Sequence, residues 1–165
     1  MHQSAYNLVQ QAISSIVPRP SRVVDIGSFD VNGCLKPLFA GVEYTGIDIL
    51  SGPNVDIVTE PYSFPFMNNS IECIVSANCM EHVSMPWRWV IELDRILQVG
   101  GHAVIHTPWQ IVHHHPPDYY RYSHEAMLVL FNEWIPSQSG SIYVTLQNSI
   151  IGMDTISHFK KVVQL

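Results

Sequence analysis

The sequence is poor in charge. Asp, Glu, Lys and Arg make up 13% of its 165 residues, against about 25% in average globular proteins. The net charge is −6 with the histidines neutral, and the eight Lys and Arg residues form no cluster beyond Lys160-Lys161. Because binding to a nucleic-acid backbone requires basic residues that neutralise phosphates, we expect no nucleic-acid partner. A sparsely charged surface is also compatible with a homo-oligomer.

Cysteine pairs and long hydrophobic runs are missing too. The three cysteines, Cys34, Cys73 and Cys79, form no C-x-x-C pair, so neither a disulfide framework nor a zinc site is expected. No apolar run reaches eighteen residues, and the first residues lack the basic and apolar segments of a signal peptide. We therefore predict no membrane span, no metal and a cytoplasmic location.

The order of apolar patterns predicts one α/β domain over residues 1–165, with an N-terminal helix within 1–21 and a core over 22–163. Strands and helices alternate, which is typical of a mostly parallel sheet covered by helices. Gly100-Gly101 is expected to close one helix as a left-handed cap. We expect helices at 4–17, 32–39, 85–97 and after Ser123, strands at 22–26, 43–48, 55–58, 70–76 and 102–107, and two final antiparallel strands at 141–147 and 155–163 joined by 148–154.

The segment from Val23 to Gly33 is the most informative part of the chain. A short β-branched run leads into Gly27, where the backbone can turn sharply and approach a ligand closely. Fifteen residues after Gly33, the next predicted strand ends on Asp48. A carboxylate in that place can accept both hydroxyls of a ribose. This arrangement predicts a nucleoside-binding strand, loop and helix, although such a turn can also close an α/β unit without a ligand.

Departures from the dinucleotide fingerprint decide which nucleoside is expected. A pyrophosphate loop needs glycine at three fixed places, whereas this loop contains Phe29 and Asp30. Carboxylates at Asp25 and Asp30 would repel a pyrophosphate but suit a cation. The loop therefore favours S-adenosylmethionine, which carries sulfonium and ammonium groups, over a nicotinamide dinucleotide.

A second group of functional side chains follows the strand at 102–107. Three adjacent histidines there point in different directions in an extended chain, which is poor spacing for a metal site. The segment can instead be a substrate loop whose rings stack on a sugar while Arg121 grips an anion. Alternatively it is a proline-rich loop packed on the sheet edge, with Arg121 simply paired to Asp118. The candidate substrate residues are His113, Asp118, Tyr120 and Arg121.

Taken together, the motifs resemble the class I S-adenosylmethionine-dependent methyltransferases of the broad type 11 methyltransferase-domain family. The resemblance implies a Rossmann-like three-layer sandwich with a mostly parallel seven-stranded sheet and an antiparallel C-terminal hairpin. The motifs that carry it are Val24-Asp25-Ile26-Gly27-Ser28, Gly46-Ile47-Asp48, Phe64-Pro65-Phe66 before Asn69-Ser70-Ile71-Glu72, Met80-Glu81-His82-Val83 and Leu97-Gln98-Val99-Gly100-Gly101.

Three further segments are similar to a subgroup often found among glycan and surface-polysaccharide biosynthesis proteins. These segments are Phe29-Asp30-Val31-Asn32-Gly33, Gly52-Pro53-Asn54-Val55-Asp56 and Pro116-x-Asp118-x-x-Arg121.

The resemblance also implies roles for individual residues. Asp48 would hold the ribose hydroxyls, Gly27 would pass beneath the amino-acid moiety, and Asp25 would orient the loop or reach the ammonium through water. Ile49 and Glu60 would contact the adenine, Ser76 and Asn78 would face the methylthio region, and Phe29 stands where the family has a further glycine. The expected cofactor-binding set is Asp25, Gly27, Ser28, Phe29, Asp48, Ile49, Glu60, Ser76 and Asn78.

Methyl transfer to oxygen chiefly requires alignment of donor and acceptor, with proton removal as a modest addition. His82 and His113 are the candidate bases because imidazole titrates near neutrality. His82 can alternatively serve a structural role in the helix that follows. With about twenty residues before the first strand, the acceptor side is expected to be open, which suits a hydroxyl of a glycan or of another small or carrier-linked molecule. The alternative is a methyltransferase-like binding module without catalysis.

Overall fold

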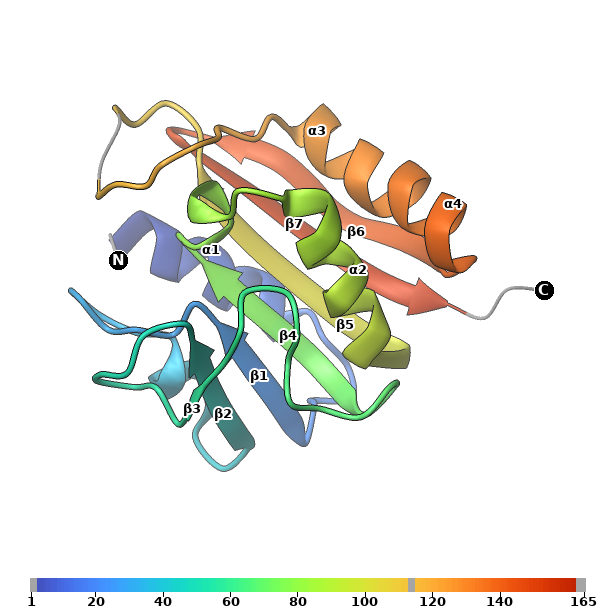
Figure 1. Ribbon diagram of the computed structural model, residues 1–165, viewed down its shortest axis with the longest axis horizontal. Coiled ribbons are helices and arrows are strands. Elements are labelled where there is room, and N and C mark those ends of the chain that lie inside the picture. The colour runs from blue at the N-terminus through green and yellow to red at the C-terminus, as the bar shows by residue number, and fades with distance from the viewer. Residues whose placement is uncertain (1–2, 113–114, 163–165) are drawn as a thin grey trace.

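A seven-stranded mixed sheet organises the computed structural model, which describes residues 3–112 and 115–162 (Figure 1). The first five strands across the sheet pair in parallel. The two C-terminal strands form an antiparallel hairpin, whose last strand also pairs antiparallel with the fifth strand. The predicted fold class, with its antiparallel C-terminal hairpin, is confirmed. In spatial order the strands are β3 (Ile57–Val58), β2 (Glu43–Asp48), β1 (Arg22–Ile26), β4 (Ile71–Ala77), β5 (Leu97–Pro108), β7 (Asp154–Val162) and β6 (Ile142–Ile151).

Helices cover both faces of the sheet, and the sheet separates the core into two clusters (Figure 1). On one face, α1 (Gln3–Ser14) buries an apolar stripe that includes Leu8 and Val9. The other face carries α2 (Pro86–Ile96) and a helical run made of α3 (His124–Leu128), the π-helical η3 (Val129–Trp134) and α4 (Ile135–Ser139). Among the described residues, no helix combines the length and apolar character needed to cross a membrane.

The predicted glycine cap at Gly100-Gly101 is wrong. Helix α2 ends at Ile96, and Leu97 already has extended backbone and begins β5. The terminal carbonyls are satisfied from β7, because Lys161 Nζ donates to Asp94 O at 2.8 Å and to Leu97 O at 3.0 Å. A buried ammonium therefore supplies the donors that a left-handed glycine would otherwise arrange.

The helix predicted at 32–39 is also wrong over its first half. Only a 3₁₀ turn, η1 (Lys36–Phe39), forms there. The Gly33 amide donates to Asp30 Oδ1 at 2.6 Å, and Gly33 has a φ of 115°. A side-chain acceptor thus takes a backbone donor that a helix would use, and the chain stays in a loop.

The C-terminal third has longer elements than the sequence pattern indicates. Ser123 caps α3 as predicted, accepting from the Ala126 amide at 3.3 Å. The helical run then passes Pro136, which lies in the first turn of α4, and ends at Ser139. Residues 148–154, expected to be a connection, extend both strands instead, so that only Gly152 and Met153 lie between β6 and β7.

We predict that Lys161→Ala destabilises the protein by about 3–5 kcal/mol, because it leaves the buried Asp94 carboxylate without its cation. Lys161 Nζ lies 3.1 Å from Asp94 Oδ1. Urea unfolding at pH 7 measures the change, and Lys160→Ala, a neighbouring lysine that is less buried, is the control. Equal losses in the two variants would contradict the anchoring role of Lys161.

Candidate functional site

Three strand ends meet at the carboxyl edge of the parallel part of the sheet (Figure 1). Strand β1 pairs with both β2 and β4, so the residues that follow these strands become neighbours. Gly27 follows β1, Asp48 ends β2 and Asn78 follows β4. Open α/β sheets bind their ligands at such an edge, which makes it the candidate site.

The backbone amides of the loop after β1 donate hydrogen bonds to other groups of the protein. The N–H groups of residues 27–30 donate to the carbonyl oxygens of Ile47 and Pro53 and to the Asp48 carboxylate, at 2.9–3.2 Å. A pyrophosphate cradle needs such amides pointed at the ligand. The observed loop is therefore held against β2 and the segment after it.

Gly27 is needed for a close approach between two segments. Its φ is 79°, and a Cβ built on it would lie 2.4 Å from both Cβ and Sγ of Cys79. Such a distance forbids any side chain at this position. The side of Gly27 that a Cβ would occupy is therefore filled by Cys79.

Asp48 is fixed by its neighbours while keeping acceptor capacity. Its Oδ1 accepts from the Leu50 amide at 3.0 Å, and its Oδ2 accepts from the Phe29 amide at 3.2 Å. Each carboxylate oxygen has two acceptor positions, so one on each oxygen remains after these bonds. This geometry suits a pair of ligand hydroxyls.

A hydrogen-bonded chain joins β1 to the loop before β3. The Tyr44 hydroxyl donates to Asp25 Oδ2 at 2.6 Å and accepts from Asn54 Nδ2 at 2.9 Å. Asn54 Nδ2 also donates to Ser28 O, and Ser28 Oγ donates to Asn54 O, both at 3.0 Å. Burial raises the pKa of Asp25 to about 7, with the charge of Asp48 raising it further against the Tyr44 hydrogen bond. This series of hydrogen bonds thus holds the Asp25 carboxyl, which titrates near neutrality.

Two of the motif segments pack on each other. The Phe29 ring lies against Gly52, where a Cβ would come within 2.1 Å of it. The Asp30 amide donates to Pro53 O at 3.0 Å. The loop after β1 and the segment before β3 therefore form one structural unit, with Phe29 as its packing contact.

The remaining candidate cofactor residues lie in different surroundings. Ser76 is buried, and its hydroxyl donates to Ile26 O at 2.7 Å, so it ties β4 to β1. The backbone N–H of Asn78 donates to His106 O at 3.1 Å, and Asn78 has a φ of 52°. Ile49 is 56% exposed beside Asp48, and the exposed Glu60 lies just beyond β3. Their roles toward an adenine or a methylthio group stay predictions.

Of the two candidate bases, one is held by the protein and the other is outside the described residues. His82 Nδ1 lies 2.6 Å from Pro117 O, and His82 Nε2 lies 3.7 Å from Glu81 Oε1. Both ring nitrogens therefore face protein groups. His113 falls between residues 112 and 115, in the part of the chain that the structure does not describe.

The segment after β5 is tied to the protein through Arg121. Its guanidinium donates to Ile111 O, Val112 O and Tyr120 O and to both oxygens of the buried Asp118 carboxylate. Such a set uses all five N–H donors of an arginine. These contacts match the packing interpretation of this segment, and the Arg121 grip on a substrate anion stays an untested prediction.

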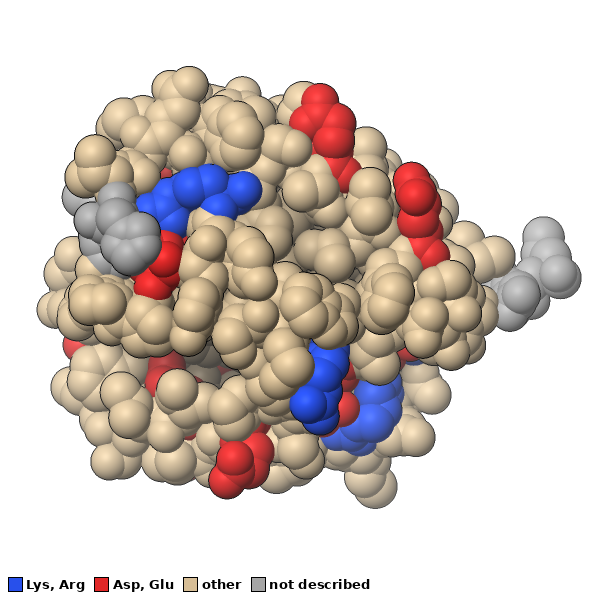
Figure 2. All heavy atoms as spheres, turned by 45° about the horizontal axis from the view of Figure 1, so that its top comes forward, with Lys and Arg blue, Asp and Glu red and all other residues tan. Residues whose placement is uncertain are grey.

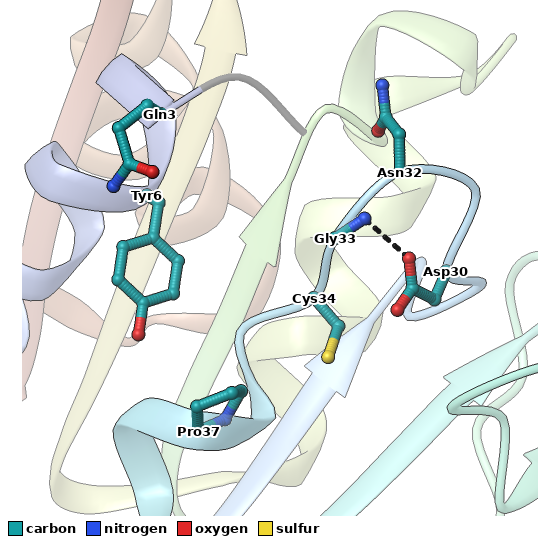
Figure 3. Close-up of a pocket in the computed structure, with 7 residues that line it drawn as sticks. All are labelled: Gln3, Tyr6, Asp30, Asn32, Gly33, Cys34 and Pro37. Atoms are coloured by element: carbon teal, nitrogen blue, oxygen red, sulfur yellow. Dashed lines mark hydrogen bonds between the residues drawn. The ribbon is translucent and has the colours of Figure 1, made fainter.

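A cavity of about 370 Å³ lies between the start of α1 and the loop after β1 (Figure 3). Figure 3 shows that α1 contributes the Tyr6 side chain, while the loop contributes Asp30 with its hydrogen bond to Gly33. The cavity adjoins the loop that the sequence singles out. Its lining consists of Gln3, Tyr6, Asp30, Asn32, Gly33, Cys34 and Pro37.

Sequence reasoning missed four residues of this edge: Tyr44, Asn54, Cys79 and Glu81. Tyr44 and Asn54 act through hydrogen bonds between separate segments, which their own sequence neighbours do not reveal. Cys79 entered only as one of three cysteines without a C-x-x-C pair, and Glu81 entered only as part of the Met80–Val83 motif. No local pattern distinguishes Glu81 from a surface acid, because its burial appears only in the fold.

We predict that Asp25→Asn makes the protein less sensitive to alkaline pH. The raised pKa of Asp25 means that its contribution to stability is complete below its unfolded pKa of about 3.9 and is lost as the pH rises through 7. Relative to the wild type, the free energy of unfolding of the variant should rise by about 2 kcal/mol between pH 5 and pH 8. Urea unfolding at each pH measures this difference. The exposed Glu133→Gln is the control, and parallel pH profiles for Asp25→Asn and wild type would refute the assignment.

Comparisons with known proteins agree with this architecture. Residues 24–105 match the family model described as "Methyltransferase domain". An uncharacterized methyltransferase of Mycobacterium sp. (strain JLS) is 31% identical over 112 residues, which cover 60% of this chain and 44% of that protein. The chain thus spans less than half the length of this curated relative.

Solved structures share the fold at low sequence identity. A SAM-dependent methyltransferase from Aquifex aeolicus aligns with a TM-score of 0.69 and 16% identity, covering 98% of this chain and 94% of that one. The Burkholderia thailandensis 1,6-didemethyltoxoflavin-N1-methyltransferase, solved with S-adenosylhomocysteine, aligns with a TM-score of 0.75 and 13% identity, covering 98% and 80%. The chain therefore has the class I methyltransferase fold, and its residues 24–105 match the methyltransferase-domain family.

Proposed function

We propose that this domain transfers a methyl group from S-adenosylmethionine to a hydroxyl group of a neutral, polyhydroxylated acceptor, such as a glycan or a small or carrier-linked molecule. The observation that carries the proposal is the charge of the carboxyl edge. Asp25 and Asp48 lie there, while the guanidinium of Arg121 is used by protein acceptors. Such an edge suits a cationic donor and a neutral acceptor.

The residues at this edge fit the cofactor. S-adenosylmethionine supplies a methyl group on a positively charged sulfur. Asp48 keeps acceptor positions for the two ribose hydroxyls, and Asp25 is the carboxyl that would favour the ammonium. Ile49 and Glu60 lie on the β2–β3 side, where the adenine would extend. Because residues 27–30 use their amides internally, recognition of the cofactor rests on these side chains.

The surroundings favour an acceptor without negative charge. A phosphate or carboxylate needs a free cation near the reaction site. In Figure 2, the Lys and Arg side chains form small separate groups on a mostly uncharged face. A hydroxyl of a neutral molecule would not require such a partner.

Aromatic rings offer a surface for a sugar. Tyr119 is 52% exposed on the segment after β5, and its ring centroid lies 6.1 Å from that of Tyr120. Sugar rings pack well on exposed tyrosine faces that also carry a polar hydroxyl. The cavity of Figure 3 would supply amide and hydroxyl partners from Gln3 and Tyr6 of α1.

The narrower assignment to glycan or surface-polysaccharide biosynthesis rests on the three motif segments. Two of them pack together through Phe29 and Gly52, and the third contains the Asp118–Arg121 pair. Their contacts are internal to the fold. The motifs therefore support the assignment through resemblance, whereas Tyr119 and the charge of the edge support the acceptor chemistry.

The protein's part in the reaction is chiefly alignment. In-line transfer needs the acceptor oxygen held opposite the departing sulfur, which fixed side chains and a rigid sheet edge provide. Proton removal from the hydroxyl adds a smaller effect. His82 is anchored by Pro117 O, so an acceptor proton would reach it only if that contact opens. His113 stays the other candidate base.

We predict that Asp48→Asn weakens binding of S-adenosylmethionine and S-adenosylhomocysteine alike, because both carry the ribose. A hydrogen bond to a charged group contributes about 1.5–3 kcal/mol, so the dissociation constants should rise roughly 10- to 100-fold. Isothermal titration calorimetry measures both ligands. Glu43→Gln, an exposed carboxylate at the other end of β2, is the matched control. If the folded wild type binds neither ligand, the non-catalytic binding module replaces this proposal.

The acceptor class is tested by transfer of a labelled methyl group to neutral sugars and to the same sugars carrying phosphate. We expect faster methylation of the neutral set, and Tyr119→Ala should raise the acceptor KM several-fold without changing cofactor affinity. Trp87→Ala, which removes an exposed ring on α2, is the control. A preference for phosphorylated sugars would contradict the proposed acceptor.

A further inference from the structure

Glu81 is a buried carboxyl without a hydrogen-bond donor from any other residue in the described part of the chain. It lies in the 3₁₀ turn η2 (Met80–His82), directly after β4, and its side chain is 0% exposed. Neither Oε1 nor Oε2 accepts a hydrogen bond from another described residue, and the Glu81 backbone amide lies close enough to favour the charged form. Leaving a buried polar group unsatisfied costs free energy, and a charged one costs more. A position this costly calls for a function.

The backbone around Glu81 is well satisfied, so local disorder does not explain the orphaned side chain. Glu81 O accepts from the amides of Tyr119 and Tyr120 at 2.9 and 3.3 Å. The Tyr122 hydroxyl donates to Met80 O at 3.3 Å. The segment after β5 thus closes over η2 through main-chain contacts and leaves the carboxyl beneath it.

The charged and titratable neighbours of Glu81 come from three directions. His82 lies beside it on η2, with Nε2 3.7 Å from Oε1. The Asp118–Arg121 pair faces it from the segment after β5, and the Tyr122 hydroxyl comes from the same segment. Cys79 precedes it on the way from β4. Since Arg121 is already paired with Asp118, its charge offsets a charge on Glu81 only in part.

Cys79 connects Glu81 with the cofactor edge. Burial raises the pKa of the Cys79 thiol, and the charges of Glu81, Asp48 and Asp25 raise it further. The thiol also fills the space beside Gly27. Cys79 therefore contacts the first loop and precedes η2, and carboxyl groups from β1, β2 and η2 act on its thiol.

The covalent structure of the cofactor places its sulfur in the same region. Asp25 is assigned to the amino-acid end and Asp48 to the ribose, and the sulfur is bonded between those two parts. A ligand held by both aspartates would bring its sulfur close to Cys79, and so within range of Glu81. A cation there would favour the ionised carboxylate, because an opposite charge nearby stabilises the charged form.

We infer that Glu81 responds to the charge of the cofactor's sulfur, releasing its proton when the sulfonium of S-adenosylmethionine is bound and keeping it when the neutral thioether of S-adenosylhomocysteine is bound. The inference rests on the proposed cofactor binding at this edge. The enzyme would thereby bind its methyl donor in preference to the spent product. No covalent bond changes, and the released proton passes to the solvent.

Protonation in the free protein is compatible with this role. Burial is the main cause that raises the pKa of Glu81 to about 8; the Glu81 backbone amide and Arg121 oppose this rise, and Asp118 adds to it. At pH 7.5 the free carboxyl would then hold roughly three-quarters of a proton. The Asp25 carboxyl responds to the ammonium group, which both ligands share, and so cancels in their comparison.

The experiment is isothermal titration calorimetry of the whole chain at pH 7.5 in phosphate and in Tris, whose different ionisation enthalpies report proton release. S-adenosylmethionine should release about half a proton or more beyond S-adenosylhomocysteine. Sinefungin, which carries an amine in place of the sulfonium, should resemble S-adenosylmethionine. The affinity ratio of donor to product should rise between pH 6.5 and pH 8.5, because Glu81 ionises more readily as the pH rises.

Glu81→Gln should abolish the difference in proton release and lower the donor-to-product affinity ratio about tenfold at pH 8.5, with product affinity within twofold of wild type. Glu133→Gln is the control for a general change of charge. Equal proton release by donor and product in the wild type overturns the inference and needs no variant. If the folded protein binds neither ligand, the proposed cofactor site falls with it, and calorimetry distinguishes that result from equal release.

Discussion

The close contact between the loop after β1 and the residues after β4 is the constraint on which the site depends. A side chain at Gly27 would lie 2.4 Å from Cys79, so only glycine allows the two segments to meet. With that contact made, the amides of residues 27–30 turn toward β2, where one of them helps to fix the Asp48 carboxylate. The site is consequently built from acidic side chains rather than from backbone donors. This difference separates a cation-binding edge from a phosphate-binding one.

Charge is distributed unevenly along the sheet. At the amino edge the acids have basic partners: Asp94 contacts Lys161, and Glu92 accepts from Arg95 at 2.6 and 2.8 Å. At the carboxyl edge, Asp118 is likewise paired with Arg121, whereas Asp25 and Glu81 are buried without a Lys or Arg ion pair among the described residues. Breaking a buried ion pair is costly, and an unpaired buried carboxyl shifts its pKa instead. The paired acids thus support the fold, whereas Asp25 and Glu81 lower the stability of the fold at alkaline pH.

Much of the sheet could be predicted because its signals are local. Runs of β-branched residues and the turns between them identified β1, β2, β4 and the C-terminal hairpin, and the spacing from Gly33 identified Asp48. Errors arose where a distant group decides the local structure. The end of α2 depends on Lys161, more than sixty residues away, and the loop at 30–35 depends on one Asp30 hydrogen bond. Glu81 needed the fold to show that it is buried, since its motif alone fits a surface acid equally well.

Methyl transfer from a sulfonium changes the charge of the bound cofactor, and a site made of carboxyl groups is sensitive to that change. A neutral site would hold the charged and uncharged sulfur with similar affinity, because only the methyl group would distinguish them. Each carboxylate near the sulfur adds a Coulombic preference that is strongest where water is excluded. The same burial that raises the pKa values of Asp25 and Glu81 therefore strengthens their response to a cation. In the proposed site, the free energy that the empty fold loses by burying Glu81 would be the source of a preference for the charged ligand.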